Sequence, residues 1–222
     1  MPKKTGLLVM LVFAAVFLQS SLREAVSLDT LREAGIPVEE MEEAGISVED
    51  MKLYLVFWED IRYFPVAVQS GEKTFPFSYT DTWMEERTFG GDRKHEGCDI
   101  FGEIRTPGYY PVVSITDGTV EKVGWLPLGG WRIGVRSSGG GYFYYAHLSS
   151  YEKVFQEGDF VRAGEILGFL GDTGYGEEGT RGKFLSHLHM GLYVKARGQE
   201  EYALNPFPML RCLQEFTKEL AY

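Results

Sequence analysis

The stretch Ser186–Met190 reads SHLHM and places a His-x-His pair inside strand-like sequence. Side chains two residues apart in a strand point to the same face, so His187 and His189 would share one space. Two imidazoles aimed at one point are a common start of a metal site. The chain has only 4 histidines, and the other two, His95 and His147, also lie in short polar motifs beside strand-like sequence. We therefore expect one shared site.

The first of these motifs starts at His95, reads HEGCD and ends at Asp99. Residues four apart share a face of a strand or of a helix. Together with His189, this pair supplies two imidazoles and a carboxylate, a usual protein ligand set for one catalytic Zn²⁺. His147 and His187 then remain as neutral imidazoles near the metal, able to transfer protons during hydrolysis of an amide. The helical zincin pattern His-Glu-x-x-His does not fit, because an aspartate replaces the second histidine.

The chain contains two cysteines, Cys98 and Cys212. Cys98 lies inside the first motif and could act as a fourth ligand. In an extended strand, however, it points away from the face that His95 and Asp99 share. We interpret Cys98 as a buried structural thiol, and the sequence leaves open whether the two cysteines form a disulfide.

Composition and turn spacing predict an all-β fold. Aromatic residues make up 14% of the chain and there are 27 glycines, which suits short strands joined by tight turns in an antiparallel sheet or sandwich. We expect one hairpin over residues 131–147 and another over 110–123, with its turn at 117–118. The spacing of apolar residues near the end of the chain predicts a C-terminal helix at 211–222.

The amino terminus indicates export. An uncharged, mostly apolar run at residues 5–22 follows Lys3 and Lys4, so residues 1–22 are expected to be a signal peptide or a membrane anchor. The positive end should stay in the cytoplasm, which leaves the rest of the chain extracytoplasmic, either anchored to the cell membrane or secreted to the cell wall.

Residues 23–55 are acidic and carry a ten-residue repeat, with copies at 33–41 and 43–51. We interpret this segment as short helices separated by glycines that form a stalk, and residues 23–60 as a candidate docking surface for an envelope protein. The main domain is expected at residues 56–210. The formal net charge of -10 leaves no basic stripe for a nucleic acid, so we exclude that partner.

Taken in order, the pair His95/Asp99, the lone His147 and the pair His187/His189 resemble the hallmark of the lysostaphin-like (LytM-type) zinc metallopeptidases. The resemblance covers about residues 62–210 and implies the duplicated-hybrid-motif fold. It implies one Zn²⁺ per chain, held by His95, Asp99 and His189, with His147 and His187 as the catalytic pair. It also implies hydrolysis, with a metal-activated water, of cross-bridge or stem-peptide bonds in bacterial cell-wall peptidoglycan.

Alternatives to this function stay open. Some members of the family have lost ligands and serve as envelope scaffolds or activators, although the full set of five residues here argues against such a loss. A third hypothesis is a peptidase for a protein substrate such as a pilin or an elastin-like chain. Met190-Gly191 stands where many relatives have Phe-Glu, which leaves the cleaved bond undecided. The glycine-rich segment 174–186 is either a surface loop or a wall of the substrate groove.

Overall fold

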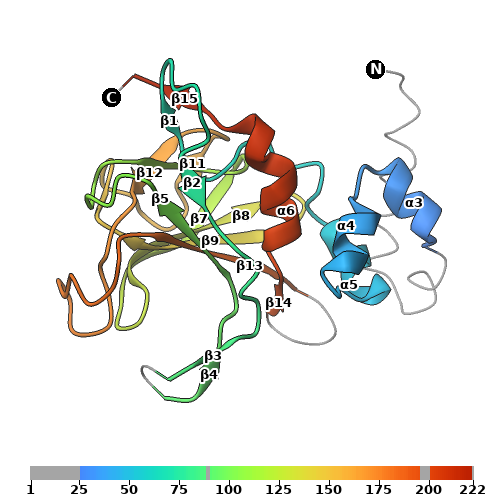
Figure 1. The fold of residues 1–222 in the computed structure, drawn as a ribbon, viewed down its shortest axis with the longest axis horizontal. Helices are drawn as coiled ribbons and strands as arrows, with labels where there is room; N and C mark the ends of the chain where they lie inside the picture. The colour runs from blue at the N-terminus through green and yellow to red at the C-terminus, as the bar shows by residue number, and fades with distance from the viewer. Residues whose placement is uncertain (1–25, 89–90, 196–200, 222) are drawn as a thin grey trace. The chain divides into compact units, whose positions relative to one another are not determined.

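The ribbon of the computed structural model (Figure 1) describes residues 26–88, 91–195 and 201–221. The chain divides into two compact units, residues 1–59 and residues 60–222. The apolar run at 5–22 lies outside the described residues, so its assignment as a signal peptide or anchor stays a prediction. Among the residues that are described, no helix is long and apolar enough to cross a membrane.

The ten-residue repeat of the first unit folds as short helices, as its sequence predicts. The described helices are α3 (Leu28–Glu33), α4 (Val38–Glu43) and α5 (Val48–Tyr54). Ser47 caps α5 by accepting a hydrogen bond from Asp50 N at 3.1 Å, which satisfies one of the free amides of the first turn. Gly35 and Gly45 follow α3 and α4 with φ of +79° and +71°, a conformation that glycine adopts without strain and that ends a helix.

The second unit is built mainly from strands. Its elements are β1 (Val68–Gln69), β2 (Phe77–Ser78), β3 (Glu86–Arg87), β4 (Arg93–Lys94), β5 (Cys98–Gly102), β6 (Pro111–Val113), β7 (Gly118–Leu126), β8 (Gly130–Ser137), β9 (Tyr142–Leu148), β10 (Ser150–Tyr151), β11 (Phe160–Val161), β12 (Ile166–Phe169), β13 (Leu188–Val194), β14 (Tyr202–Leu204), α6 (Phe207–Leu213), the 3₁₀ helix η1 (Gln214–Phe216) and β15 (Glu219–Leu220).

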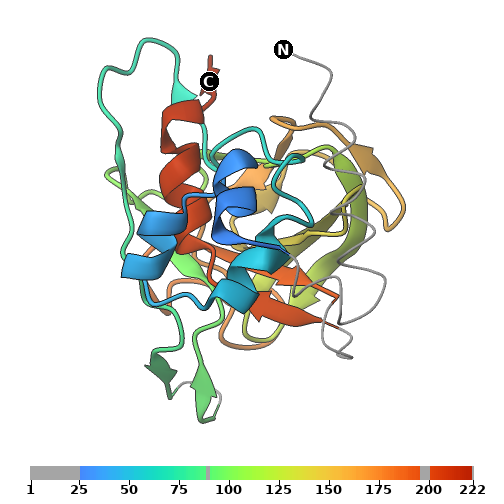
Figure 2. The ribbon, with the colours of Figure 1, turned by 90° about the vertical axis from the view of Figure 1, so that its right-hand side faces the viewer.

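The largest sheet has the order β11-β7-β8-β9-β13-β5-β2, and β14 also pairs with β13. All of its pairings are antiparallel. A second antiparallel sheet has the order β10-β12-β6. The β3–β4 hairpin extends away from the large sheet in both views (Figure 1, Figure 2). The prediction of an all-β fold with short N-terminal helices and a C-terminal helix is confirmed.

Strand alternation separates the core from the functional face. In β13, Leu188, Met190 and Leu192 are fully buried, whereas His189 and Tyr193 are partly exposed. Successive strand residues point to opposite faces, so β13 contributes apolar side chains to the core and a histidine to the other side. The fold thus presents His189 on a face backed by a rigid, packed core.

The C-terminal helix predicted at 211–222 is misplaced. Helix α6 begins at Phe207, directly after Pro206, and ends at Leu213. Proline suits the start of a helix, where no backbone N–H is needed. The tail then becomes strand β15, which pairs with β1 in parallel, and the Val68 amide donates to Lys218 O at 2.9 Å. Pairing with a distant strand therefore outweighs the local helical pattern.

One of the two predicted hairpins is correct. Strands β8 and β9 pair across the turn at 138–141, as residues 131–147 predict. The hairpin predicted over 110–123 is wrong, because β6 pairs with β12 while β7 pairs with β8 and β11. Asp117 does not close a tight turn there; its carboxylate accepts a hydrogen bond from Ala163 N at 2.8 Å instead.

Candidate metal centre and active site

Three neighbouring strands carry the candidate site. In the antiparallel register, His189 of β13 lies opposite Asp99 of β5 on one side and opposite Ala146 of β9 on the other. His147 follows Ala146 directly, and His187 stands just before β13, bridged to Gly171. The sheet register therefore brings residues almost one hundred positions apart into one row across the strands.

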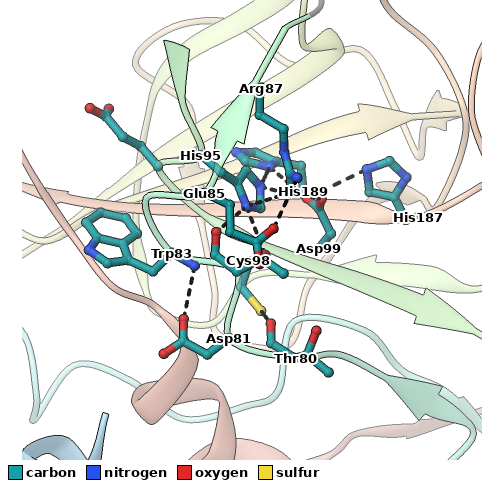
Figure 3. A network of polar contacts seen from close by, with 12 residues as sticks. Thr80, Asp81, Trp83, Glu85, Arg87, His95, Cys98, Asp99, His187 and His189 are labelled. Carbon is teal, nitrogen blue, oxygen red and sulfur yellow. Dashed lines mark hydrogen bonds and ion pairs between the residues drawn. The ribbon is translucent and has the colours of Figure 1, made fainter. Parts of the chain in front are cut away.

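The three residues expected to bind metal form a compact cluster (Figure 3). Asp99 Oδ1 lies 3.1 Å from His95 Nε2 and 2.9 Å from His189 Nδ1. The two imidazole nitrogens are 3.1 Å apart. These residues form the one group of metal-binding type found among the described residues.

The cluster fits a tetrahedral Zn²⁺. Ligand atoms at about 2.0 to 2.1 Å from a tetrahedral zinc stand about 3.3 Å from one another. The three observed separations, between 2.9 and 3.1 Å, are close to this value. Two imidazole nitrogens and a carboxylate oxygen are also a donor set that zinc accepts, with one coordination position left over. A larger, oxygen-rich site for Ca²⁺ would need six to eight ligands at roughly 2.3 to 2.6 Å.

Surrounding groups orient the cluster. His95 Nδ1 lies 2.9 Å from Thr82 Oγ1, 3.0 Å from Arg87 Nη2 and 3.1 Å from the carbonyl oxygen of Thr82. These contacts hold the ring with Nε2 facing Asp99 and His189. The Arg87 guanidinium, from β3, lies 3.6 Å from Asp99 Oδ2. It therefore attracts the second carboxylate oxygen while Oδ1 faces the imidazoles (Figure 3).

Asp99 is ionised in this environment. Burial raises the pKa of its carboxyl, but the hydrogen bonds with His189 and His95 act in the opposite direction and hold the pKa well below its usual range. A carboxylate is the form of aspartate that binds a metal ion. Asp99 is thus in the ionised form that a metal ligand requires.

His147 and His187 lie beside the cluster without joining it. Their ring centroids are 4.8 Å apart. His147 Nδ1 lies 2.8 Å from Thr173 O, and His187 Nδ1 lies 2.7 Å from Leu185 O. Because a carbonyl only accepts, both rings carry their proton on Nδ1 and keep Nε2 free as a base.

Both of these imidazoles are neutral at neutral pH. Burial is the main cause that lowers the pKa of His147 well below its ordinary value, and the neighbouring His187 and His189 lower it further. Burial also lowers the pKa of His187, against the attraction of the Asp99 carboxylate, which raises it. A neutral imidazole can accept a proton, which a charged one cannot.

The backbone at His147 has an unusual conformation. Its φ is +63°, a left-handed value that residues other than glycine seldom adopt and that strains the chain. The conformation is held because His147 N donates to Gly129 O at 2.7 Å and its ring packs on Phe184, with centroids 4.5 Å apart. This left-handed backbone conformation directs the His147 side chain, near the end of β9, toward the site.

An open groove of about 1290 Å³ contains all five predicted site residues. Aromatic rings line much of it, namely Phe101, Tyr142, Tyr144, Tyr175, Phe184 and Tyr193. Tyr175, Phe184 and Leu185 come from segment 174–186, so this segment is a wall of the groove. An open, partly aromatic groove of this volume can accommodate a peptide.

Cys98 lies away from the metal cluster, as strand alternation predicts. Its Sγ points to Thr80 O at 3.6 Å (Figure 3), and burial raises the pKa of the thiol. Neither Cys98 nor Cys212 forms a disulfide. The side chain is therefore a packing element, and the structure contains no bond between the two cysteines.

Gly97 leaves room for the His189 ring. A methyl group at this position would lie 2.4 Å from His189 Cε1 and 2.8 Å from Met190 O, closer than atoms can pack. We predict that Gly97→Ala displaces the ring and lowers zinc affinity about ten- to a hundredfold, measured by competition with a chelating dye. Gly71→Ala is the control for lost stability, because it strains a backbone with φ of +86° but places its methyl in open space outside the groove. Unchanged zinc affinity in Gly97→Ala would argue against His189 as a ligand.

Sequence reasoning did not find several groups at the site. Thr82, Arg87 and Thr173 orient the histidines or the carboxylate. None of them has a characteristic spacing from a histidine motif. They reach the site through the β3–β4 hairpin and through loops, so no local pattern could have indicated them.

Comparison with known proteins places this site in a family. The model of Peptidase family M23 matches residues 93–205. The chain is 42% identical over 155 residues to an L-Ala--D-Glu endopeptidase of Bacillus subtilis, covering 67% of this chain and 46% of the relative. It is 34% identical over 119 residues to lysostaphin of Staphylococcus simulans, covering 53% of this chain and 21% of the relative. The chain thus spans less than half the length of these curated relatives.

The solved structures include a candidate glycyl-glycine endopeptidase LytM from Ruminococcus gnavus. It is 38% identical in sequence, with a TM-score of 0.70, and the match covers 97% of this chain and 90% of that chain. The matched family segment contains His95, Asp99, His147, His187 and His189. The sequence, the fold and the arrangement of these five residues agree, and the chain belongs to peptidase family M23.

Proposed function

We propose that the protein is a zinc-dependent endopeptidase that hydrolyses peptide bonds of bacterial cell-wall peptidoglycan. The observation that carries this proposal is the geometry of the site. Three donor atoms from His95, Asp99 and His189 stand 2.9 to 3.1 Å apart, and two buried imidazoles with free Nε2 atoms stand beside them. The similarity to the relative named L-Ala--D-Glu endopeptidase supports a substrate that contains this peptide bond.

In this proposal the metal site and the histidine pair have separate tasks. His95, Asp99 and His189 would hold a Zn²⁺, which would supply Lewis acidity for the scissile carbonyl and for water. His147 or His187 accepts the proton of the attacking water at Nε2 and returns it to the leaving amine. The Nδ1 hydrogen bonds to Thr173 O and Leu185 O keep both rings oriented during this transfer.

The bond that we favour lies in the stem peptide. The curated relative at 42% identity is named for the L-Ala--D-Glu bond, whereas lysostaphin is only 34% identical over a shorter stretch. The groove wall contributed by Tyr175 and Phe184 is bulky and aromatic, which suits side chains better than a run of glycines. A cross-bridge is the second candidate substrate.

The cellular setting is proposed on the same basis. A domain that cuts peptidoglycan works outside the cytoplasm, and residues 5–22 would anchor it to the membrane or direct its secretion. The helical unit that includes α3, α4 and α5 is acidic and would serve as a stalk or as the docking surface for an envelope protein. A role as scaffold alone is disfavoured, because none of the five site residues has been replaced.

Digestion of cell walls tests the proposal. The purified full chain in mild detergent, loaded with zinc, would be incubated with peptidoglycans of different stem and cross-bridge types, and the products identified by mass spectrometry. We expect new peptide ends at one bond type, which disappear after chelation and return when zinc is added back. Protein that holds one zinc per chain yet releases nothing from any wall would overturn the enzyme proposal in favour of the scaffold.

A further inference from the structure

The groove is lined by basic side chains although the protein as a whole is acidic. The formal net charge of the chain is -10. Among the residues that the structure describes, the basic side chains lining the groove are Arg87, Arg93, Lys94, Lys122 and Arg132, and the acidic ones are Glu96, Asp99 and Glu201. Of these acids, Asp99 belongs to the metal cluster. The local charge of the groove is therefore opposite to that of the chain, which favours an anionic ligand.

Arg132 differs from the other cations. Arg87 lies near Glu85 and Asp99, Lys94 near Glu86, and Lys122 near Glu157, while Arg93 donates to the hydroxyl of Tyr175. Within the part of the chain that the structure describes, Arg132 has no acidic side chain in ion-pairing distance, and its Nη1 is buried with no hydrogen-bond partner. A buried guanidinium nitrogen without an acceptor is costly and calls for a ligand.

The neighbouring Arg136 shows that this sheet face can satisfy an arginine. Arg136 lies four residues further along β8, an even spacing in a strand, so it shares the face of Arg132. It donates to Glu121 at 2.7 and 3.0 Å and also to Glu201. Glu121 is thus paired with Arg136, and Glu201 pairs with it through Oε1 while its Oε2 is buried without a hydrogen-bond partner. Neither acid is within ion-pairing distance of Arg132, whose positive charge faces the groove.

The sheet register places Arg132 level with the metal cluster. His189 lies opposite Ala146 of β9, and a bulge between the pairs Trp131↔Leu148 and Ile133↔Tyr145 sets Arg132 beside the same part of β9. Adjacent strands are about 4.8 Å apart, so the backbone of Arg132 lies roughly 10 Å across the sheet from that of His189. An arginine side chain spans much of that distance. The Arg132 guanidinium can therefore reach a substrate group that lies next to the scissile bond.

We propose that Arg132 binds a carboxylate of the peptide substrate next to the scissile bond, and that it makes the enzyme selective for acidic stem peptides. The planar guanidinium can hold a carboxylate through two parallel hydrogen bonds. A free α-carboxylate on the glutamate of an L-Ala–D-Glu bond has this chemistry, whereas the carboxamide of an amidated stem has no charge. The inference rests on the proposed peptidase function and specifies its substrate.

Two stem peptides that differ only at the α-carboxyl group of D-glutamate test the proposal. One carries the free carboxylate of D-glutamate and the other the carboxamide. Because a hydrogen bond to a charged group contributes about 1.5 to 3 kcal/mol, the zinc-loaded full chain should prefer the carboxylate peptide roughly ten- to a hundredfold in kcat/KM. In Arg132→Gln this ratio should fall toward one, and Arg132→Lys should keep an intermediate ratio. Arg162→Gln, an exposed cation outside the groove, should keep the wild-type ratio.

Binding is measured separately so that the two proposals can fail independently. Calorimetry with each peptide on the metal-free chain reports the same preference without hydrolysis, and circular dichroism shows that each variant is folded. Equal affinity of the wild type for both peptides, or an unchanged preference in Arg132→Gln, would overturn the role of Arg132. Preference in binding together with no hydrolysis of either peptide would support Arg132 while overturning the endopeptidase function.

Discussion

Replacing His189 with alanine is expected to abolish both zinc binding and hydrolysis. The ring supplies one of three donor atoms, and its Nδ1 lies within 3.1 Å of both His95 Nε2 and Asp99 Oδ1. Removing it leaves two protein ligands, so zinc affinity should fall by more than about a hundredfold. Zinc content measured by atomic absorption after gel filtration, with wall digestion on the same sample, checks this result.

The control for His189→Ala is the loss of a neighbouring histidine outside the cluster. His147→Ala removes the same side chain from the same groove, but it should leave zinc content at one per chain. If His189→Ala retained a full equivalent of zinc, the proposed ligand set would be wrong. Loss of zinc from both variants would mean that the histidines act together in a way that the cluster geometry does not explain.

His147→Ala is expected to keep its metal and to lose turnover by about 10² to 10⁴-fold, the usual contribution of a general base or acid. The ring stands beside the cluster with Nδ1 committed to Thr173 O at 2.8 Å and Nε2 free. Alanine removes the proton acceptor and leaves the three ligand atoms in place. The measurement is kcat on a defined stem peptide, together with zinc content and thermal unfolding of the same sample.

The role of His147 is contradicted if His147→Ala hydrolyses the peptide at the wild-type rate. In that case His187, whose Nε2 lies 3.7 Å from Asp99 Oδ1, would carry the proton transfer alone. His187→Ala in a parallel series distinguishes the two. Because both rings are buried, the unfolding temperature of each variant shows whether a loss of rate comes from chemistry or from packing.

Local patterns predicted the fold class well and the exact pairings poorly. The alternation of apolar and polar residues in β13, with Leu188 and Met190 buried and His189 on the other face, is a property of neighbours in sequence. The pairing of one strand with another is not a property of neighbours in sequence. The Asp117-Gly118 dipeptide resembles a hairpin turn, but the partners of β6 and β7 are more distant strands, and no local signal records that choice.

The same limit explains the misplaced C-terminal helix. Residues 210–220 have helical spacing, and α6 does occupy part of this range and the residues before it. Beyond η1 the backbone of β15 hydrogen-bonds to β1, about 150 residues earlier in the chain. A parallel pair of this kind depends on both partners being held in place by the rest of the fold, so the propensity of the tail alone could not reveal it.

The sequence by itself determined the chemical content of the site and the faces on which its parts lie. The spacings of His187 and His189, and of His95 and Asp99, follow from the period of a strand, and the use of all four histidines indicated a single site. Only the tertiary structure decided how the parts meet. The antiparallel register sets His189 opposite Asp99, the left-handed backbone turns His147 inward, and Arg87 and Arg132 reach the groove from other strands. These contacts join residues far apart in the chain, and their geometry depends on packing that no local pattern encodes.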